Sequence, residues 1–135
     1  MAAERTLAII KPDAVGKNLI GKIIADLEEA GFVVRRMRMT RLTEAEARRF
    51  YEVHAERPFY DSLVRFMTSD RCVPMVLERT SAISALRETI GATDPARAAE
   101  GTIRRLHAES VERNAIHASD SVENAAREIE FFFSE

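Results

Sequence analysis

Hydrophobic and polar positions follow two different spacings along this chain, and turn-forming residues separate the segments. Residues 5–10 form a short apolar run closed by the segment 11–13, which predicts a buried strand that ends in a turn. Apolar residues in 20–27 then recur at helical spacing, and Gly31 predicts the end of that helix. One face of the following segment, 32–42, is more apolar than the other, which predicts an antiparallel, half-exposed strand.

The middle of the chain carries a clear helix-start signal. Thr43 followed by Glu46 resembles a capping box and predicts a charged helix, and a second short helix is expected over 61–67. Residues 71–77 predict a third strand, but Pro74 cannot donate a backbone hydrogen bond there. An edge position and an irregular stretch both remain open for this strand.

The second half of the chain completes an alternating order of strands and helices. A helix is expected over 80–90, a short helix over 103–108 and a brief fourth strand over 114–117. Asp120 with Glu123 predicts the cap of a last helix. The expected buried face of that helix consists of Val122, Ala125, Ala126, Ile129 and Phe133. The order of elements predicts an α+β sandwich of the ferredoxin-like type, a four-stranded antiparallel sheet covered by helices.

Composition and charge favour a single compact domain without an obvious macromolecular partner. The 135 residues, 46% of them hydrophobic, predict one domain over 1–135. Twenty basic residues oppose 22 acidic ones, so the net charge of −2 gives no reason to expect nucleic acid or a membrane as the main partner. The short apolar start and the lone Cys72, expected to be a core thiol, favour a cytoplasmic protein.

The segment 16–23 looks at first like a phosphate-binding P-loop. Seven positions match that pattern, but the eighth is Ile23, where the loop needs a Ser or Thr hydroxyl for magnesium. Because Ile23 also belongs to the apolar face of the helix over 20–27, a loop running into a helix is the better interpretation.

His117 is a stronger chemical candidate, because it lies where a short strand meets a capped helix. Exposed backbone N–H groups and the positive end of a helix dipole suit phosphate chemistry there. Imidazole is a competent nucleophile near neutral pH, and Glu128 and Ser119 are within plausible reach to orient it. A lone histidine is more often a surface or core residue, so this signal is weak alone. His54 and His107 lack such a setting, and metal-ligand spacing is missing among the three.

Separated cations and a hydroxyl supply what a triphosphate needs when there is no P-loop. Each lies at the end of an element or in a loop. They are Lys11, Arg87, Thr93 and Arg104. Taken singly, each charge is more often a solvated surface group.

Five segments together resemble the nucleoside diphosphate kinase family and follow one another in that family's order. They are Lys-Pro-Asp-Ala at 11–14, Glu-Arg-Pro-Phe at 56–59, Gly-Ala-Thr-Asp-Pro at 91–95, Gly-Thr-Ile-Arg at 101–104 and Asn-Ala-Ile-His-Ala-Ser-Asp-Ser at 114–121. The resemblance runs from Arg5 to Phe133 without a large insertion. It implies transfer of a γ-phosphoryl group from a nucleoside triphosphate to a nucleoside diphosphate, in a ping-pong cycle through phosphorylated His117.

The resemblance also implies roles for the residues around His117. Glu128 and Ser119 would hold the imidazole, with Glu128 in the more direct contact. Arg87, Thr93 and Arg104 would bind the phosphates, which Mg²⁺ would bridge without direct protein ligands.

The sugar and base would meet a second group of residues. Lys11 and Asn114 would reach the ribose 3′-hydroxyl and a nearby phosphate oxygen, and Tyr51 would place a phenol close to Lys11. Phe59 would stack on the base, with Val111 on its other face. Stacking on a π-face that every base has predicts broad base tolerance.

Some positions depart from the family pattern. Ala118, Asp70 and Arg79 stand where glycine is usual, and a positive φ at Ala118 would strain the alanine. Resemblance implies a homotetramer or homohexamer, and the short tail ending at Glu135 favours the tetramer. Two alternatives are a non-catalytic ferredoxin-like module that binds a nucleotide or small ligand, and a structural role through oligomer assembly.

Overall fold

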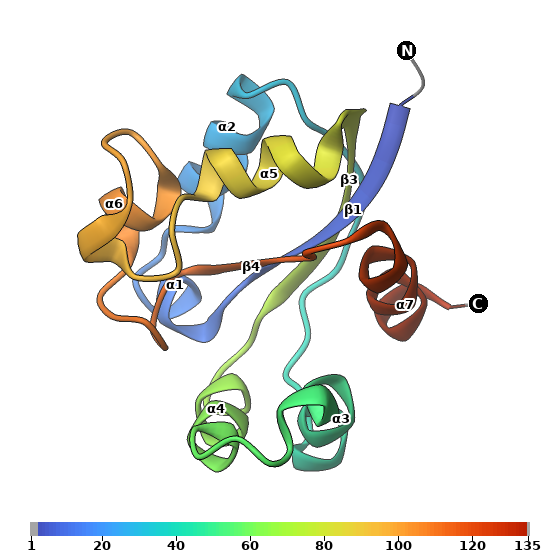
Figure 1. The fold of residues 1–135 in the computed structure, drawn as a ribbon, viewed down its shortest axis with the longest axis vertical. Coiled ribbons are helices and arrows are strands. Elements are labelled where there is room, and N and C mark those ends of the chain that lie inside the picture. Colours follow the sequence, from blue (N-terminus) through green and yellow to red (C-terminus); the bar gives the residue numbers. More distant parts are fainter. Residues whose placement is uncertain (1–2, 135) are drawn as a thin grey trace.

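The computed structural model describes residues 3–134, which fold into a four-stranded antiparallel sheet with helices on both faces (Figure 1). The strands are β1 (Ala3–Ile10), β2 (Val33–Met37), β3 (Val73–Thr80) and β4 (Ile116–Ala118). Their order in the sheet is β2-β3-β1-β4, with every neighbouring pair antiparallel. The predicted ferredoxin-like α+β architecture is confirmed. Predictions that involve residues 1, 2 and 135 lie outside the described residues.

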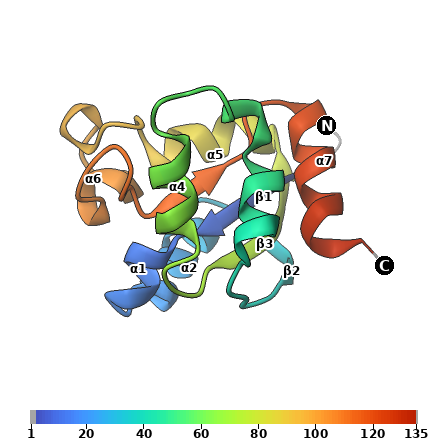
Figure 2. The ribbon, with the colours of Figure 1, turned by 90° about the horizontal axis from the view of Figure 1, so that it is seen from below.

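The helices divide between the two faces of the sheet. The first layer comprises α1 (Pro12–Gly16), α2 (Ile20–Glu29), α5 (Ala82–Ile90) and α6 (Ile103–His107). The second comprises α3 (Glu44–Phe50), α4 (Tyr60–Met67) and α7 (Val122–Phe133), and Figure 2 looks onto this layer. Short 3₁₀ turns, η1 (Glu52–His54) and η2 (Pro95–Arg97), lie in the loops. No helix within residues 3–134 has the length and apolar character needed to cross a bilayer.

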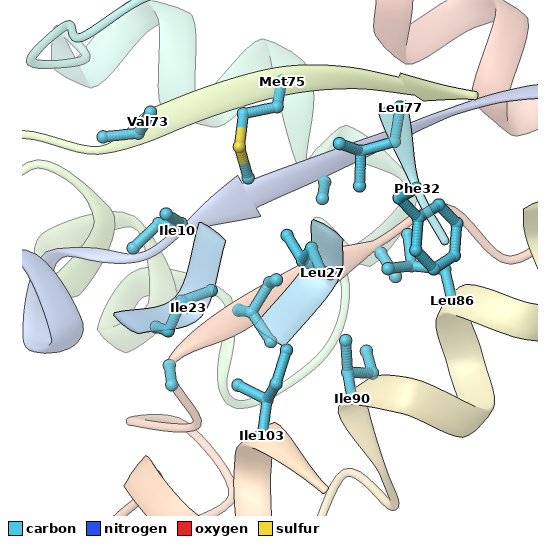
Figure 3. Close-up of a cluster of buried hydrophobic side chains, with 14 of the residues drawn as sticks. Ile10, Ile23, Leu27, Phe32, Val73, Met75, Leu77, Leu86, Ile90 and Ile103 are labelled. Carbon is cyan, nitrogen blue, oxygen red and sulfur yellow. The ribbon is translucent and has the colours of Figure 1, made fainter. Parts of the chain in front are cut away.

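The core beneath the first helical layer explains why the segment 16–23 is not a P-loop. Ile23 and Leu27 of α2 are fully buried and point towards Met75 and Leu77 of the sheet (Figure 3). Ile23 therefore contributes apolar burial, worth about 2 kcal/mol, rather than a place for a metal-binding hydroxyl. The interpretation as a turn running into a helix agrees with α1 and α2.

The third strand is central, so an edge position for Pro74 is wrong. Pro74 pairs with Ile9 of β1 on one side, and its carbonyl accepts a hydrogen bond from Arg38 N on the other. Since the nitrogen and carbonyl of a strand residue point the same way, the missing donor faces the chain just beyond the end of β2. The proline is tolerated there because β2 has stopped pairing regularly at Met37.

The second strand is shorter than the predicted 32–42. A register shift between Val34 and Arg36 interrupts its pairing with β3, and beyond Met37 only the isolated bridge between Thr40 and Cys72 is found in the described residues. The bulge makes this edge irregular, as is common in edge strands. Cys72 is fully buried, as predicted.

The N-terminal cap predicted from the sequence is found at α3 but not at α7. Thr43 and Glu46 form the predicted capping box of α3. In contrast, the cap of α7 is Ser121, whose hydroxyl accepts from Asn124 N, rather than Asp120.

The buried face of α7 also differs from the prediction. Val122 and Ala126 are exposed. The buried residues are Ala125, Glu128, Phe132 and Phe133. The face is rotated because the polar Glu128 has buried hydrogen-bond partners, which hydrophobic spacing alone cannot reveal.

Candidate active site

A pocket of about 620 Å³ opens at the end of the sheet where β4 meets the helices of the second layer. Every residue proposed for the site from the sequence lines it except Ser119, which lies just behind the wall. These lining residues are Lys11, Tyr51, Phe59, Arg87, Thr93, Arg104, Val111, Asn114, His117 and Glu128. Segments more than a hundred residues apart in the chain therefore meet in one cavity.

His117 is placed by the alternation of side chains along β4. Ile116 and Ala118 point into the core beneath the first helical layer, so His117 points to the opposite face. Its ring contacts the edges of Phe50 and Tyr51, with centroid distances of 5.6 and 6.4 Å. Its Nε2 lies 2.8 Å from Glu128 Oε1, and within residues 3–134 its Nδ1 has no hydrogen-bond partner.

Glu128 is a buried carboxylate with two hydrogen-bond partners on one oxygen. Oε1 receives the His117 ring N–H and the Ser119 hydroxyl, the latter at 2.7 Å. Burial alone would raise the pKa of Glu128, but the hydrogen bonds from His117 and the Ser119 hydroxyl lower it below its ordinary value. The ionised carboxylate accepts from Nε2–H, which leaves the lone pair on Nδ1. Ser119 thus acts on the imidazole through Glu128.

Arg104 places a guanidinium in the pocket that is held in position by two backbone carbonyls. Its Nη2 donates to Ile116 O at 2.8 Å and its Nη1 to Gly91 O at 3.1 Å, while in the described residues its buried Nε has no partner. Burial and the charge of Arg87 lower the pKa of Arg104 to about 10, so it stays charged at neutral pH. Two arginines that line one pocket favour an anion between them, although the Asp120 carboxylate lines the same pocket and offsets part of their charge.

Gly91 is needed at the turn that anchors Arg104. Its φ is +90°, and a β-carbon there would lie 2.5 Å from Thr102 Oγ1. Any side chain would displace the loop that carries Thr93 and the carbonyl that holds Arg104.

Lys11 and Asn114 form a second polar cluster across the pocket. Lys11 is only 7% exposed, and its Nζ donates to Asn114 Oδ1 at 2.9 Å and Glu112 O at 3.0 Å. Asn114 donates in turn to Thr93 O at 3.3 Å. Burial lowers the pKa of Lys11 to about 8. The buried Tyr51 hydroxyl has no hydrogen-bond partner among the described residues, and burial raises the pKa of Tyr51 far above its ordinary value.

The mouth of the pocket is apolar. Phe59 and Val111 are 45% and 55% exposed, and both line the pocket. The ring of His54 packs against Phe59 at 5.4 Å.

Several residues that line the pocket carry no recognisable signal in the motifs of the sequence. They include Asn124 and Arg127 of α7 and Glu112 of the loop between α6 and β4. Asn124 lies four residues before Glu128, so helical spacing would have placed it on the same face. Glu112 had no such signal, because its position depends on the folded loop.

Backbone strain lies at Ala115 rather than at Ala118. Ala118 belongs to β4 and is absent from the positive-φ residues of the described chain, whereas Ala115 has φ +74°. A β-carbon in this conformation costs about 1–2 kcal/mol. The strain falls between two pocket residues, Asn114 and His117, so it belongs to the turn that presents them.

Replacing Ala115 with glycine is expected to leave the free energy of unfolding unchanged within about 0.5 kcal/mol, since relief of strain offsets both the added entropy of the unfolded chain and the loss of a buried methyl. Chemical denaturation measures the change. The matched variant Ala118→Gly removes the same methyl from ordinary strand backbone and should instead lose about 1 kcal/mol. Equal losses in both variants would contradict the assignment of strain to Ala115.

Comparisons with known proteins agree with this geometry. A family profile described as "Nucleoside diphosphate kinase" matches residues 4–135. The chain is 60% identical over 131 residues to a nucleoside diphosphate kinase of Chloroherpeton thalassium, covering 97% of this chain and 93% of that one. It is 57% identical over 135 residues to one of a Methylobacterium species, covering 100% and 96%.

Solved structures are equally similar in fold. The Aquifex aeolicus nucleoside diphosphate kinase has a TM-score of 0.95 at 46% identity, covering 98% of this chain and 96% of that chain. The enzyme of Encephalitozoon cuniculi, without ligand, has a TM-score of 0.94 at 36% identity, covering 98% and 90%.

Proposed function

The chain belongs to the nucleoside diphosphate kinase family, and from this premise we propose that its pocket moves a phosphoryl group between nucleotides on Nδ1 of His117. The protein is a phosphotransferase that passes the γ-phosphoryl group of a nucleoside triphosphate to a nucleoside diphosphate. The observation that carries the choice of atom is the 2.8 Å contact between Nε2 and Glu128, because it commits one nitrogen and leaves the other nucleophilic.

The chemical step follows from that contact. The Nδ1 lone pair attacks the γ-phosphorus, a P–N bond forms, and the bond to the β-phosphate oxygen breaks, releasing the diphosphate. The ring then carries positive charge, which the Glu128 carboxylate stabilises while Ser119 holds that carboxylate in place. A β-phosphate oxygen of the second diphosphate reverses the step. One site serves both substrates, so the cycle is ping-pong.

The phosphates would lie against the side of the pocket formed by Arg104 and Arg87. Arg104 is already oriented by two backbone carbonyls, so it can stabilise the transition-state charge with little reorganisation. Arg87, from the last turn of α5, and the Thr93 hydroxyl, from the loop that follows α5, would complete the contacts.

The nucleoside would occupy the rest of the pocket. Lys11 and Asn114 would bind the ribose 3′-hydroxyl and a phosphate oxygen, and the base would stack between Phe59 and Val111 at the exposed mouth. Tyr51 would place a phenol close to Lys11, and its ring also contacts the imidazole of His117. Stacking without a polar partner for the base edge supports broad base tolerance.

A divalent metal belongs to the chemistry of this family, and we propose that it is Mg²⁺. Within residues 3–134 there is no group of three or more His, Cys, Asp or Glu side chains placed for a metal, whereas Asp120 lines the pocket. Mg²⁺ often binds through one or two carboxylates plus substrate phosphates, so the site fits an ion held mainly by the nucleotide. When bound, it would neutralise charge on the β- and γ-phosphate oxygens.

Assembly and compartment extend the proposal. We propose that the chain acts as one domain in a cytoplasmic homotetramer, with a homohexamer as the alternative. The edge of the sheet supports self-association, because Val33 and Met37 of β2 and Met39 just beyond it are about half exposed.

A labelling experiment tests the proposed function against a non-catalytic nucleotide-binding module. Incubation with γ-labelled ATP and magnesium, followed by removal of nucleotide, should leave a label that is stable in base, lost in acid and removed by any nucleoside diphosphate. The variant His107→Gln, altered outside the pocket, should label equally. Nucleotide binding without label would favour the binding module, because such a module has no use for an oriented nucleophile.

A further inference from the structure

Asp13 is a buried carboxylate that the transfer step leaves without a role. It lies in α1, two residues after Lys11, and is only 6% exposed. Its Oδ2 accepts a hydrogen bond from Ala115 N at 3.0 Å, while its buried Oδ1 accepts none from the described residues. Burying a carboxylate that has one oxygen without a hydrogen-bond partner lowers the stability of the fold, so a neutral residue would be more favourable if only packing mattered.

The partner of Asp13 is the strained residue of the pocket. Ala115, at φ +74°, is held at both polar atoms by one short segment, since its carbonyl accepts from Lys11 N at 2.9 Å and its N–H donates to Asp13. These bonds offset the cost of the left-handed conformation. They also fix the turn that directs Asn114 towards Lys11 and begins the strand carrying His117.

The charge of Asp13 acts on Lys11 as well. Four influences on the Lys11 ammonium are resolved: burial, Asp13, Arg104 and Glu112, in order of decreasing size. Burial and Arg104 lower its pKa, whereas Asp13 and Glu112 raise it, and the balance leaves the pKa at about 8. The ring of Phe66 also faces the ammonium at 5.4 Å, with Arg113 over the same ring. Asp13 is the larger of the two supporting anions.

We propose that Asp13 is a positioning residue for nucleotide binding and transfer, whose carboxylate fixes the Asn114–Ala115 turn and keeps Lys11 charged in the pocket. The inference rests on the proposed function, because Lys11 matters here as a nucleotide ligand. The Asp13 carboxylate has two roles with different requirements. The hydrogen bond to Ala115 N needs only an acceptor, whereas support of the charged Lys11 needs a negative charge.

The variant Asp13→Asn separates these roles, because an amide oxygen can accept from Ala115 N without a charge. The dissociation constant for ADP is measured from pH 5.5 to 9.5. Binding to the unmodified chain should weaken as pH rises through about 8, where Lys11 loses its proton. In Asp13→Asn the same weakening should begin roughly one pH unit lower, with affinity within about threefold of the unmodified chain at pH 6.

Further variants distinguish positioning from a general loss of stability. Asp13→Ala removes acceptor and charge, so it should show the pH shift and also lose about tenfold in kcat at every pH. Ala115→Gly in the same chain should recover much of that kcat, because glycine adopts the turn unaided, while leaving the pH shift. Asp26→Asn, which removes a carboxylate on α2, should leave the profile unchanged.

The outcomes are distinct. An unshifted ADP profile in Asp13→Asn, or in Asp13→Asn with Ala115→Gly if the single variant does not fold, would overturn the inference while wild-type labelling at His117 would still support the kinase. Absence of wild-type labelling would contradict the kinase, and the ADP profile would still decide the role of Asp13.

Discussion

Replacing His117 with glutamine is expected to reduce phosphoryl transfer by at least about 10⁴-fold, because removal of a nucleophile abolishes the covalent route. ADP binding should stay within about threefold of the unmodified chain, since it would depend on the arginines, Lys11 and Phe59. Glutamine is chosen because its amide can still donate to Glu128, so the buried carboxylate keeps a partner and the fold is preserved.

Steady-state transfer and calorimetric binding of ADP measure the two quantities separately. His107→Gln is the matched control, because its ring faces Asp26 on α2 at 3.9 Å rather than the pocket. Transfer within about tenfold of the unmodified rate in His117→Gln would show that another group accepts the phosphoryl, and the mechanism would fail.

The second large effect is expected from Arg104→Met. Loss of an oriented cation at a transferring phosphoryl group should lower kcat/KM by about 10²–10³-fold, and equally for triphosphate and diphosphate because both use one site. The variant also leaves Gly91 O and Ile116 O without their donor, which should cost about 1–3 kcal/mol of stability. Thermal unfolding must therefore show that it is folded at the assay temperature.

Arg105→Met is the matched control for this prediction. Arg105 is the next residue of α6, is exposed and does not line the pocket. Its loss should change kcat/KM by less than about twofold. A selective loss for only one nucleotide in Arg104→Met would contradict a shared site and hence the ping-pong cycle.

Local chemistry made part of this structure predictable. The capping box at Thr43 depends only on residues within four positions of one another, so the N-terminus of α3 was predicted correctly. The central position of β3 was not, because Pro74 is acceptable only where β2 has ended, and that depends on pairing between distant segments. The cap at Ser121 was missed for a smaller reason, since Asp120 next to it is an equally good capping residue.

The site divides in the same way. His117 and the cations could be named from the sequence because a family resemblance links their segments. The nitrogen that reacts could not, because the choice depends on which ring atom meets Glu128 across the strand and helix. Asp13 gave no signal of its own, since its importance comes from the backbone angle of a residue 102 positions away.

Because β4 has only three residues, the position of His117 depends on the register in which this strand pairs with β1. Ile116 and Ala118 enter one core while His117 faces the pocket, so a slip of one residue against β1 would exchange the faces. The imidazole would then be buried beneath α5, and an isoleucine or alanine would meet the nucleotide. The number of residues between α6 and β4 therefore helps to set the register of β4 against β1. An insertion or deletion of one residue there could inactivate the enzyme without altering any residue of the active site.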